Sequence, residues 1–205
     1  MNQADPETVK AFVIAGHHDF EKVKAMLEEN PTLLEAKAPW NETALQAACH
    51  MGRRDIAAWL LERGAQPDLC CWAAMGEVGK VRQALEADPE SASYRGVHGM
   101  SVLMHAAFGG SLEVAKLLLD YGADTVNEPD GASSPLHGAA MRGDKALVQL
   151  LLEHGARKDA KGFDGKTPAE VAQEAGNAEV ARLLSARGRV VAREQGLGYK
   201  PRPRG

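Results

Sequence analysis

Two adjacent cysteines are the most reactive pair of side chains in the sequence. Cys70 and Cys71 lie in the stretch "DLCCWAAMGEVG", which runs from Asp68 to Gly79. A thiolate can act as a nucleophile or bind zinc, whereas three cysteines in 205 residues are too few for a disulfide framework. Consecutive side chains on a helix diverge by about 100°, which disfavours both a bond between these sulfurs and their joint binding of one ion.

Seven histidines are the other candidate ligands, and none follows the spacing of a helical metal site. The sequence contains no H-E-x-x-H motif, in which two histidines share one helix face. Histidines near helix ends also have ordinary structural roles, because a partly positive imidazole is favourable there. We therefore expect neither a bound metal nor a cofactor.

Two stretches resemble catalytic motifs without completing them. "AKGFDGKT", Ala160 to Thr167, would be a phosphate-binding loop only if residue 160 were glycine. "GGSLEV" lacks the G-x-S-x-G of a nucleophile elbow. No pair of carboxylates stands out by spacing, so the sequence predicts a protein that is not an enzyme.

Composition narrows the class of protein. The chain is 44% hydrophobic but only 5% aromatic, which suits closely packed helices better than a sheet. A net charge of −4 disfavours general attraction to nucleic acid or anionic membranes. "MNQADPETVK" at the N-terminus is polar, and no run reaches the ~18 apolar residues of a membrane span. We expect a cytoplasmic protein with reduced cysteines and no membrane contact.

The elements that carry these residues repeat along the chain. Similar segments start at Thr43, Ser101, Ser134 and Thr167, and each predicts a short helix, a glycine turn and a second helix with a Val/Ile and Leu-Leu stripe. A Ser or Thr at the start suits an N-cap, and the glycine after the second helix suits a left-handed C-cap. One such unit cannot bury its apolar face alone, so the units must stack.

The best-preserved segment, "SPLHGAAMRG" from Ser134 to Gly143, resembles the ankyrin repeat, whose pattern is T-P-L-H-x-A-A-x-x-G. The resemblance implies an all-α ankyrin repeat solenoid of stacked helix-turn-helix units with short β-hairpin or loop fingers. It is interpreted as a bacterial type of about six repeats. Two of them, around Gly16 and Gly76, are degenerate.

The predicted ankyrin domain covers residues 1–186. The tail at 187–205 is basic and rich in Gly and Pro, and we expect it to be flexible or to cap the last repeat in part. Only "AQPD" separates the second unit's end from Leu69, so a gap in the row of fingers is predicted between the second and third units. The predicted units lie roughly at 5–36, 37–66, 67–92, 93–125, 126–158 and 159–186.

The same resemblance implies a function. Ankyrin repeats bind partners through the variable positions of the first helices, which form a concave face, and through the finger tips. We expect a monomeric, non-catalytic scaffold that binds a protein or peptide, and nucleic acid is disfavoured. The predicted contact residues are Trp40, His50, Met51, Cys71, Met75, His98, His105, Phe108, Met141, Arg142 and Phe163.

Two alternatives remain open at this stage. Cys71, His50 and His105 fall at concave positions of successive units, so they could form a metal or enzymatic site without an evident fourth ligand. The basic tail, with six Arg and Lys against Glu194 alone, could instead bind nucleic acid or an acidic partner.

Overall fold

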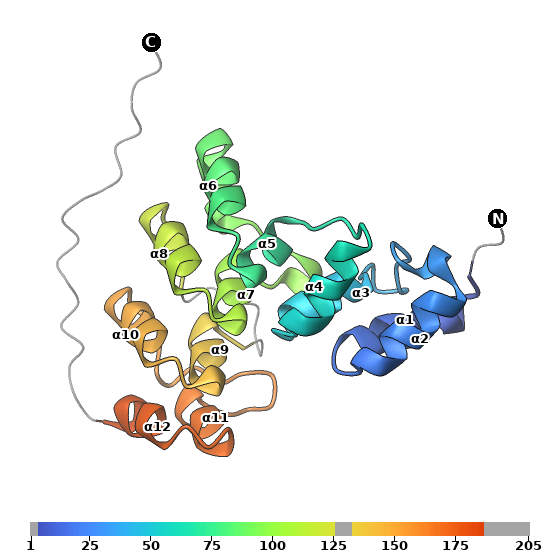
Figure 1. The fold of residues 1–205 in the computed structure, drawn as a ribbon. Helices are drawn as coiled ribbons and strands as arrows, with labels where there is room; N and C mark the ends of the chain where they lie inside the picture. Colours follow the sequence, from blue (N-terminus) through green and yellow to red (C-terminus); the bar gives the residue numbers. More distant parts are fainter. Residues whose placement is uncertain (1–3, 126–132, 187–205) are drawn as a thin grey trace, which may run out of the picture.

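The computed structural model describes residues 4–125 and 133–186, and this part of the chain forms six successive pairs of α-helices (Figure 1). The first helices of the pairs are α1 (Pro6–Gly16), α3 (Ala44–His50), α5 (Leu69–Met75), α7 (Val102–Gly109), α9 (Pro135–Arg142) and α11 (Pro168–Glu174). The second helices are α2 (Phe20–Glu29), α4 (Arg54–Glu62), α6 (Val78–Ala87), α8 (Leu112–Asp120), α10 (Lys145–Glu153) and α12 (Ala178–Ser185). The all-α prediction is confirmed.

Local sequence signals set the ends of the first helices. Thr43 and Thr167 accept hydrogen bonds from backbone N–H groups of the first turn, and Gln46 and Glu170 complete the capping boxes. At the other end, Gly110 and its counterparts have positive φ, 72° in this case, which a glycine adopts without strain. Short, well-capped helices of fixed length follow from these signals.

The connections between helix pairs differ in length at one place. Residues 30–43, 88–101, 121–134 and 154–167 link successive pairs with fourteen residues each, whereas residues 63–68 link α4 to α5 with six. Three short 3₁₀ helices lie within the described long connections: η1 (Pro31–Leu33), η2 (Pro89–Ser93) and η3 (Val97–Gly99). In place of the β-hairpins expected in the fingers, the described residues contain one isolated bridge, between Arg95 and Ser101.

The missing finger changes how the pairs stack. Helix α3 contacts α7 as well as α5, so first helices two units apart touch across the short unit. The finger of the fourth pair covers α5, because a Cβ on Gly96 would lie 2.8 Å from Sγ of Cys70. In Figure 1, α6, α8, α10 and α12 form one outer row, and α4 points in a different direction.

The helix with the paired cysteines joins two cores. Cys71 and Ala74 belong to the core of the first two pairs, whereas Cys70 and Ala73 belong to the core that runs to Leu184. The two sulfurs therefore face different neighbours, as expected for adjacent positions of a helix. The cysteines contribute to packing, and none of the three is in a disulfide bond.

None of the described helices is both long and apolar enough to cross a membrane. The predictions for the basic tail at 187–205 concern residues outside the described part of the chain.

Candidate functional site

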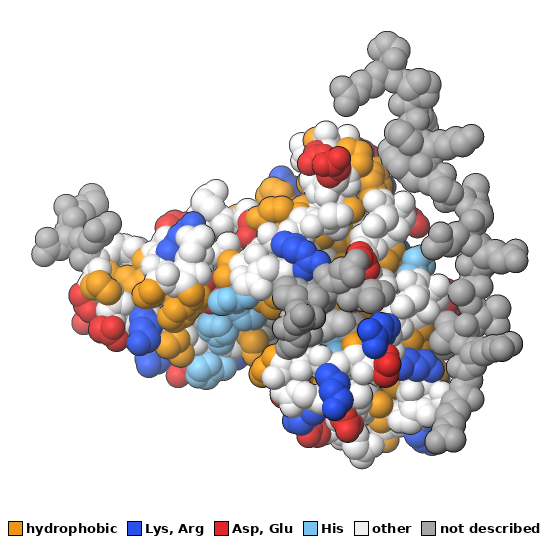
Figure 2. All heavy atoms as spheres, turned by 180° about the vertical axis from the view of Figure 1, so that it is seen from behind, with side chains coloured by type: hydrophobic (Ala, Val, Ile, Leu, Met, Phe, Trp, Pro, Cys, Tyr) orange, Lys and Arg blue, Asp and Glu red, His pale blue; other side chains and the backbone are white. Residues whose placement is uncertain are grey.

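A row of apolar side chains follows the C-terminal ends of the first helices. Three of them have large exposed fractions: Ile14 is 42% exposed, Met51 is 44% and Met141 is 37%. Phe108 and Met75 are half-buried at the corresponding ends of α7 and α5. In this article these five residues are called the concave row. Figure 2 shows hydrophobic side chains beside a group of histidines on one face of the array.

Backbone contacts hold the concave row in position. A Cβ on Gly138 would lie 2.6 Å from the ring of Phe108, so the phenylalanine fits because residue 138 is glycine. Arg142 donates from Nη1 to the carbonyl oxygen of Phe108 at 3.2 Å, and Arg54 donates from Nη2 to that of Met75 at 2.6 Å. The predicted contact residue Arg142 thus also ties two units together.

The finger residues of the predicted contact set lie in different environments. Phe163 is 84% exposed on the finger before α11. His98 lies on the finger before α7 with 45% of its side chain exposed. Trp40 is half-buried, and its Nε1–H donates to Oε2 of Glu42 at 2.5 Å.

Two residues of the predicted contact set are buried and therefore cannot contact a partner. Cys71 has no exposed surface, and its contact with Cys49 and its burial raise the pKa of its thiol. His105 is 4% exposed, and its Nδ1 lies 2.9 Å from the carbonyl oxygen of Ser101. Burial lowers the pKa of His105 to about 4, so this imidazole is neutral near pH 7. A partner cannot reach either side chain while the helices stay packed.

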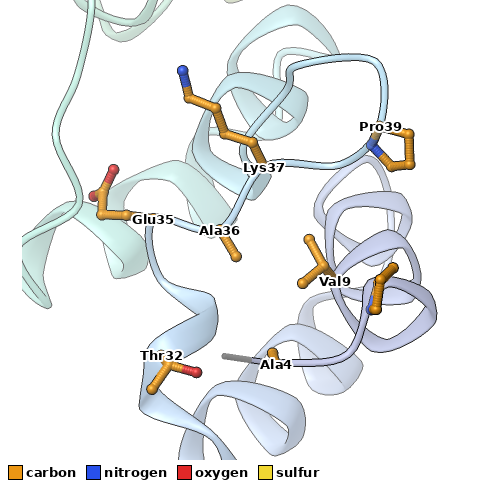
Figure 3. A pocket seen from close by; sticks show the side chains of 8 residues that line it. Ala4, Val9, Thr32, Glu35, Ala36, Lys37 and Pro39 are labelled. Atoms are coloured by element: carbon orange, nitrogen blue, oxygen red, sulfur yellow. The ribbon is translucent and has the colours of Figure 1, made fainter. Parts of the chain in front are cut away.

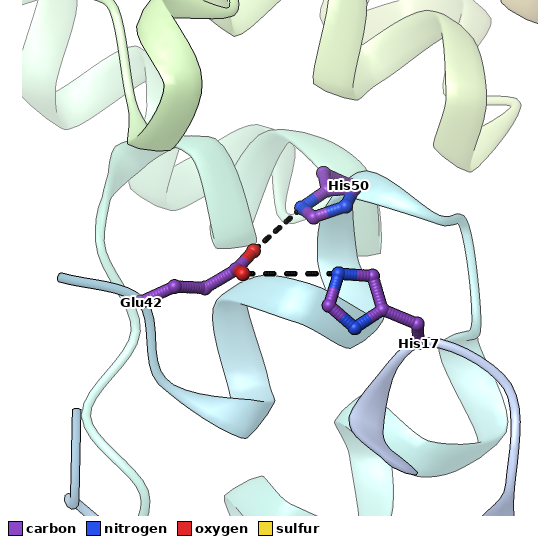
Figure 4. Close-up of side chains that lie close together, drawn as sticks. All are labelled: His17, Glu42 and His50. Carbon is purple, nitrogen blue, oxygen red and sulfur yellow. Dashed lines mark ion pairs between the residues drawn. The ribbon is translucent and has the colours of Figure 1, made fainter. Parts of the chain in front are cut away.

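The structure brings together three residues that the sequence analysis did not combine. Nδ1 of His50 lies 2.9 Å from Oε1 of Glu42, and Nε2 of His17 lies 3.7 Å from Oε2 (Figure 4). Glu42 is fully buried, whereas the His17 and His50 side chains keep 25% and 11% of their surface exposed. Nε2 of His98 lies 3.5 Å from Oε2 of the same carboxylate. These four residues are called the His–Glu cluster.

Each member of the His–Glu cluster comes from a different place in the array. His17 begins the turn after α1, Glu42 ends the finger before α3, and His50 is the last residue of α3. His98 is on the finger before α7, which reaches the second pair because the third pair has only a short connection. The sequence indicates this cluster only weakly, because His17 directly follows the turn glycine Gly16 whereas His50 precedes the turn glycine Gly52 by two residues.

The electrostatics of the His–Glu cluster favour a carboxylate. Burial raises the pKa of Glu42, but the close contacts with His50, Trp40 and His17 outweigh burial and hold this pKa below its usual value. Burial lowers the pKa of His17, and the charge of Glu42 opposes that effect only in part. A buried carboxylate ringed by imidazoles and one indole N–H is an arrangement that can hold a cation.

The metal set considered from the sequence is wrong. Among the described residues, the side chains whose ligand atoms converge are His17, Glu42 and His50. Cys71 and His105 are not part of this set: Cys71 is buried against Cys49, and His105 against the carbonyl oxygen of Ser101.

Two cavities lie near these surfaces. The first, of about 410 Å³, opens between the fingers of the second and fourth pairs and is lined by Trp40, Gln46, Asp68, Tyr94 and His98 among others. The second, of about 500 Å³, lies between the start of α1 and the loop at 32–39 (Figure 3). Its inner wall is aliphatic, with Val9 pointing inward and Lys37 outward, so it offers little to orient a polar ligand.

Comparison with known proteins decides the family. Residues 103–194 match the family described as "Ankyrin repeats (3 copies)", and residues 40–72 match "Ankyrin repeat". The chain is 36% identical over 130 residues to cyclin-dependent kinase 4 inhibitor B of Rattus norvegicus, covering 62% of this chain and 97% of that protein. The chain belongs to the ankyrin repeat family. Its fold is therefore the ankyrin solenoid that Ser134–Gly143 indicated.

Further relatives share the repeats. Cyclin-dependent kinase inhibitor 2A of Homo sapiens is 37% identical over 117 residues, which are 56% of this chain and 72% of that protein. The Homo sapiens protein "Ankyrin repeat and KH domain-containing protein 1" is 33% identical over 129 residues, 62% of this chain but 4% of that protein. These relatives are eukaryotic, so the interpretation as a bacterial type is not supported. As a member of this family the chain is a protein–protein interaction module.

Proposed function

We propose that this ankyrin module binds a segment of another protein along the concave row, with the fingers at the edge of the contact. The observation that carries the proposal is the succession of exposed apolar side chains Ile14, Met51 and Met141 at equivalent ends of first helices. Contiguous apolar surface with adaptable methionines is typical of protein-binding faces. Phe108 and Met75 continue the row between them.

The relatives suggest a class of partner. Two of them are named as inhibitors of cyclin-dependent kinases, and the repeats of this chain cover 97% of one and 72% of the other. Other relatives with similar identity carry different names, because the likeness follows the repeats themselves. A protein kinase is therefore the first class of partner to test, and the proposed surface does not depend on that class.

The finer features of the proposal rest on the fold and composition. We propose a monomer that acts without catalysis in the cytoplasm. Its ankyrin domain at 1–186 would consist of six units, each holding one helix pair. The remaining contact residues of this proposal are Trp40, His50, His98, Arg142 and Phe163, because each has exposed surface.

A matched pair of double variants tests the surface. Met51→Glu with Phe108→Glu places two negative charges in the concave row, whereas Gln83→Glu with Gln149→Glu places two on exposed positions of the second helices α6 and α10. Affinity capture with the full chain, followed by mass spectrometry, and direct binding to purified cyclin-dependent kinase 4 supply the readouts. Loss of the captured partner with the first pair alone supports the proposal. Equal recovery with both pairs contradicts it, and kinase binding by itself decides only the class of partner.

A further inference from the structure

We propose that the His–Glu cluster is a binding site for a divalent transition-metal ion of the zinc type. His17, Glu42 and His50 supply three ligand atoms. His98, whose Nε2 lies 3.5 Å from Oε2 of Glu42, is the candidate for the fourth. None of these residues belongs to the concave row, although His50 and His98 are also among the proposed contact residues, and no part of the argument depends on protein binding. It also differs from the cysteine-containing set considered from the sequence.

The spacing of the ligand atoms fits a tetrahedral ion. A zinc ion with bonds of about 2.0–2.1 Å has its ligand atoms about 3.3 Å apart. In the His–Glu cluster, Nδ1 of His50 lies 2.9 Å from Oε1 of Glu42, whereas Nε2 of His98 and Nε2 of His17 lie 3.5 Å and 3.7 Å from Oε2. The ligand atoms of His17, Glu42 and His50 all lie within 4.8 Å of one another. His98 lies outside this limit, so its exposed side chain would have to move toward the other three before it could complete the site.

The hydrogen bond on the far side of His17 orients its lone pair. Nδ1 of His17 lies 3.0 Å from the carbonyl oxygen of Val13, and only a protonated Nδ1 can donate to that oxygen. In the neutral imidazole, Nε2 therefore presents a bare lone pair toward the carboxylate of Glu42. Two lone pairs facing each other repel unless a proton or a cation lies between them. Histidine ligands of metals commonly donate their other N–H to a backbone carbonyl in this way.

One oxygen of the buried Glu42 carboxylate, Oε1, has no hydrogen-bond partner within the described part of the chain. Among the described residues, the ion pairs of Glu42 are all with histidines, although its side chain has no exposed surface. Oε1 of Glu42 and Nδ1 of His50 are buried and close, yet neither makes a hydrogen bond of acceptable geometry. A carboxylate taken out of water this way is costly unless a cation compensates it. Trp40 meets only the other oxygen, Oε2.

The backbone around the His–Glu cluster is also held in unfavourable conformations. Asn41 and His98 have φ of 65° and 60°, and they are the non-glycine residues with positive φ in the described chain. Both lie on the fingers that carry ligand atoms. Such strain persists where the surroundings enforce it, and ligand sites are common places for it. The exposed edge of His98 faces solvent, so an ion has a route into the site.

The ion would connect parts of the array that are far apart in sequence. His17 belongs to the first pair, Glu42 and His50 to the second, and His98 to the finger of the fourth. Imidazole and carboxylate ligands suit zinc, and nickel, cobalt and iron(II) share this preference. The shared chemistry is a divalent cation bound by two or three nitrogens and one carboxylate.

Zinc and cobalt titrations of the tag-free full chain test the proposal. After treatment with a chelator, the protein should take up one equivalent of zinc in competition with a chromophoric chelator, and its thermal midpoint should rise. One equivalent of Co²⁺ should give the visible absorption of a four-coordinate nitrogen and oxygen site, without a thiolate charge-transfer band. Elemental analysis of the protein as purified identifies the ion acquired in the cell.

Histidine-to-glutamine variants locate the site. His17→Gln combined with His50→Gln should weaken zinc binding at least about 100-fold, because loss of outer partners alone costs 10–100-fold. His18→Gln is the matched control, since His18 is the exposed neighbour of His17 and lies outside the converging set. His98→Gln changes a residue of an exposed finger, so it should keep the fold and weaken binding less. Circular dichroism of each variant checks folding.

Three results would overturn the proposal. One is wild-type protein that yields all its zinc to the chelator and shows no change in thermal midpoint. Another is equal zinc affinity of the folded double variant and the His18→Gln control. A cobalt spectrum with a thiolate band would assign the ion to the cysteines instead. If the double variant does not fold, the His98→Gln affinity and the cobalt spectrum of the wild type decide.

Discussion

Nδ1 of His50 lies 2.9 Å from Oε1 of Glu42, although His50 is the last residue of α3 and Glu42 lies before the first residue of this helix. The contact spans the length of α3, since Glu42 lies two residues before the first residue of this helix and His50 is its last. It links the buried carboxylate to His50, the residue that directly precedes Met51 of the concave row. Helix α3 thus carries the capping box and His50 of the His–Glu cluster, and its C-cap residue, Met51, belongs to the concave row.

Replacing Trp40 with phenylalanine should reduce stability. The change removes the Nε1–H that donates to Glu42 and keeps most of the aromatic packing. A hydrogen bond to a charged group contributes about 1.5–3 kcal/mol, and partial exposure of Trp40 places the expected loss at the lower end of that range. Urea unfolding followed by circular dichroism, with zinc removed, measures the change.

Trp59→Phe is the matched control for that variant. Trp59 packs edge-on against Phe20 and under the guanidinium of Arg63, so the substitution alters packing without removing a bond to a carboxylate. Its effect should be smaller. An equal or larger loss of stability in Trp59→Phe would show that the bond to Glu42 is not what Trp40 contributes.

Two glycines should respond to alanine with opposite signs. A Cβ on Gly109 would lie 2.0 Å from the carbonyl oxygen of Ala74, because α7 and α5 approach closely there. Gly109→Ala should therefore cost at least about 1–3 kcal/mol by overpacking. Gly79 lies within α6 with open space around its Cβ position, so Gly79→Ala should stabilise by about 0.5–1 kcal/mol. Thermal or urea unfolding in which Gly109→Ala is at least as stable as the wild type would refute the close packing.

Lowering the pH should reduce the free energy of unfolding through protonation of His105. Burial lowers its folded pKa to about 4, below the ordinary value of 6.5, so the unfolded chain takes up the proton first. The contribution of unprotonated His105 to the free energy of unfolding is complete above about pH 6.5 and is lost as the pH falls toward 4. At most roughly 3 kcal/mol is at stake, from 1.36 kcal/mol for each unit of pKa.

His105→Gln separates this contribution from those of other groups. The variant should be less stable near pH 7 but should lose less free energy of unfolding between pH 7 and pH 4 than the wild type. A residual slope remains, because burial also lowers the pKa of His137. Parallel pH profiles for wild type and variant would mean that His105 does not titrate as described.

Phe163 tests the finger tips separately from the fold. Its ring is 84% exposed, so Phe163→Ser should change the free energy of unfolding by less than about 0.5 kcal/mol. If the finger before α11 contacts the partner, the same variant should bind it more weakly. Unchanged partner affinity would remove this finger from the proposed surface while leaving the concave row intact.

The repeated sequence signals made the helix pairs predictable, whereas the one irregular link before Leu69 made the His–Glu cluster hard to predict. The Ser/Thr caps, the turn glycines and the Leu-Leu stripes recur, so the helix pairs could be derived from the residues and their spacing. The shortened link before Leu69 was also visible as missing length. The consequence of this short link could not be derived from the sequence: the finger that carries His98 covers α5 and reaches Glu42.

For Cys71 and His105, the repeat pattern led to a wrong expectation of exposure. Repeat register assigned Cys71 and His105 to the concave face, but register does not say how closely neighbouring first helices approach. Gly109 allows α7 to pack tightly on α5, and the side chains at this junction become buried. Exposure along the face therefore depends on local packing that a repeat pattern alone does not contain.

Photo-crosslinking through methionine tests the central claim most directly. Photo-methionine incorporated throughout the chain reports every methionine at once, including Met51 and Met141 of the concave row and Met26 on the second helix α2. With the native partner bound, mass spectrometry should find intermolecular crosslinks at Met51 and Met141 and none at Met26. Crosslinks confined to Met26, with Met51 and Met141 unreacted, would contradict binding through the concave row.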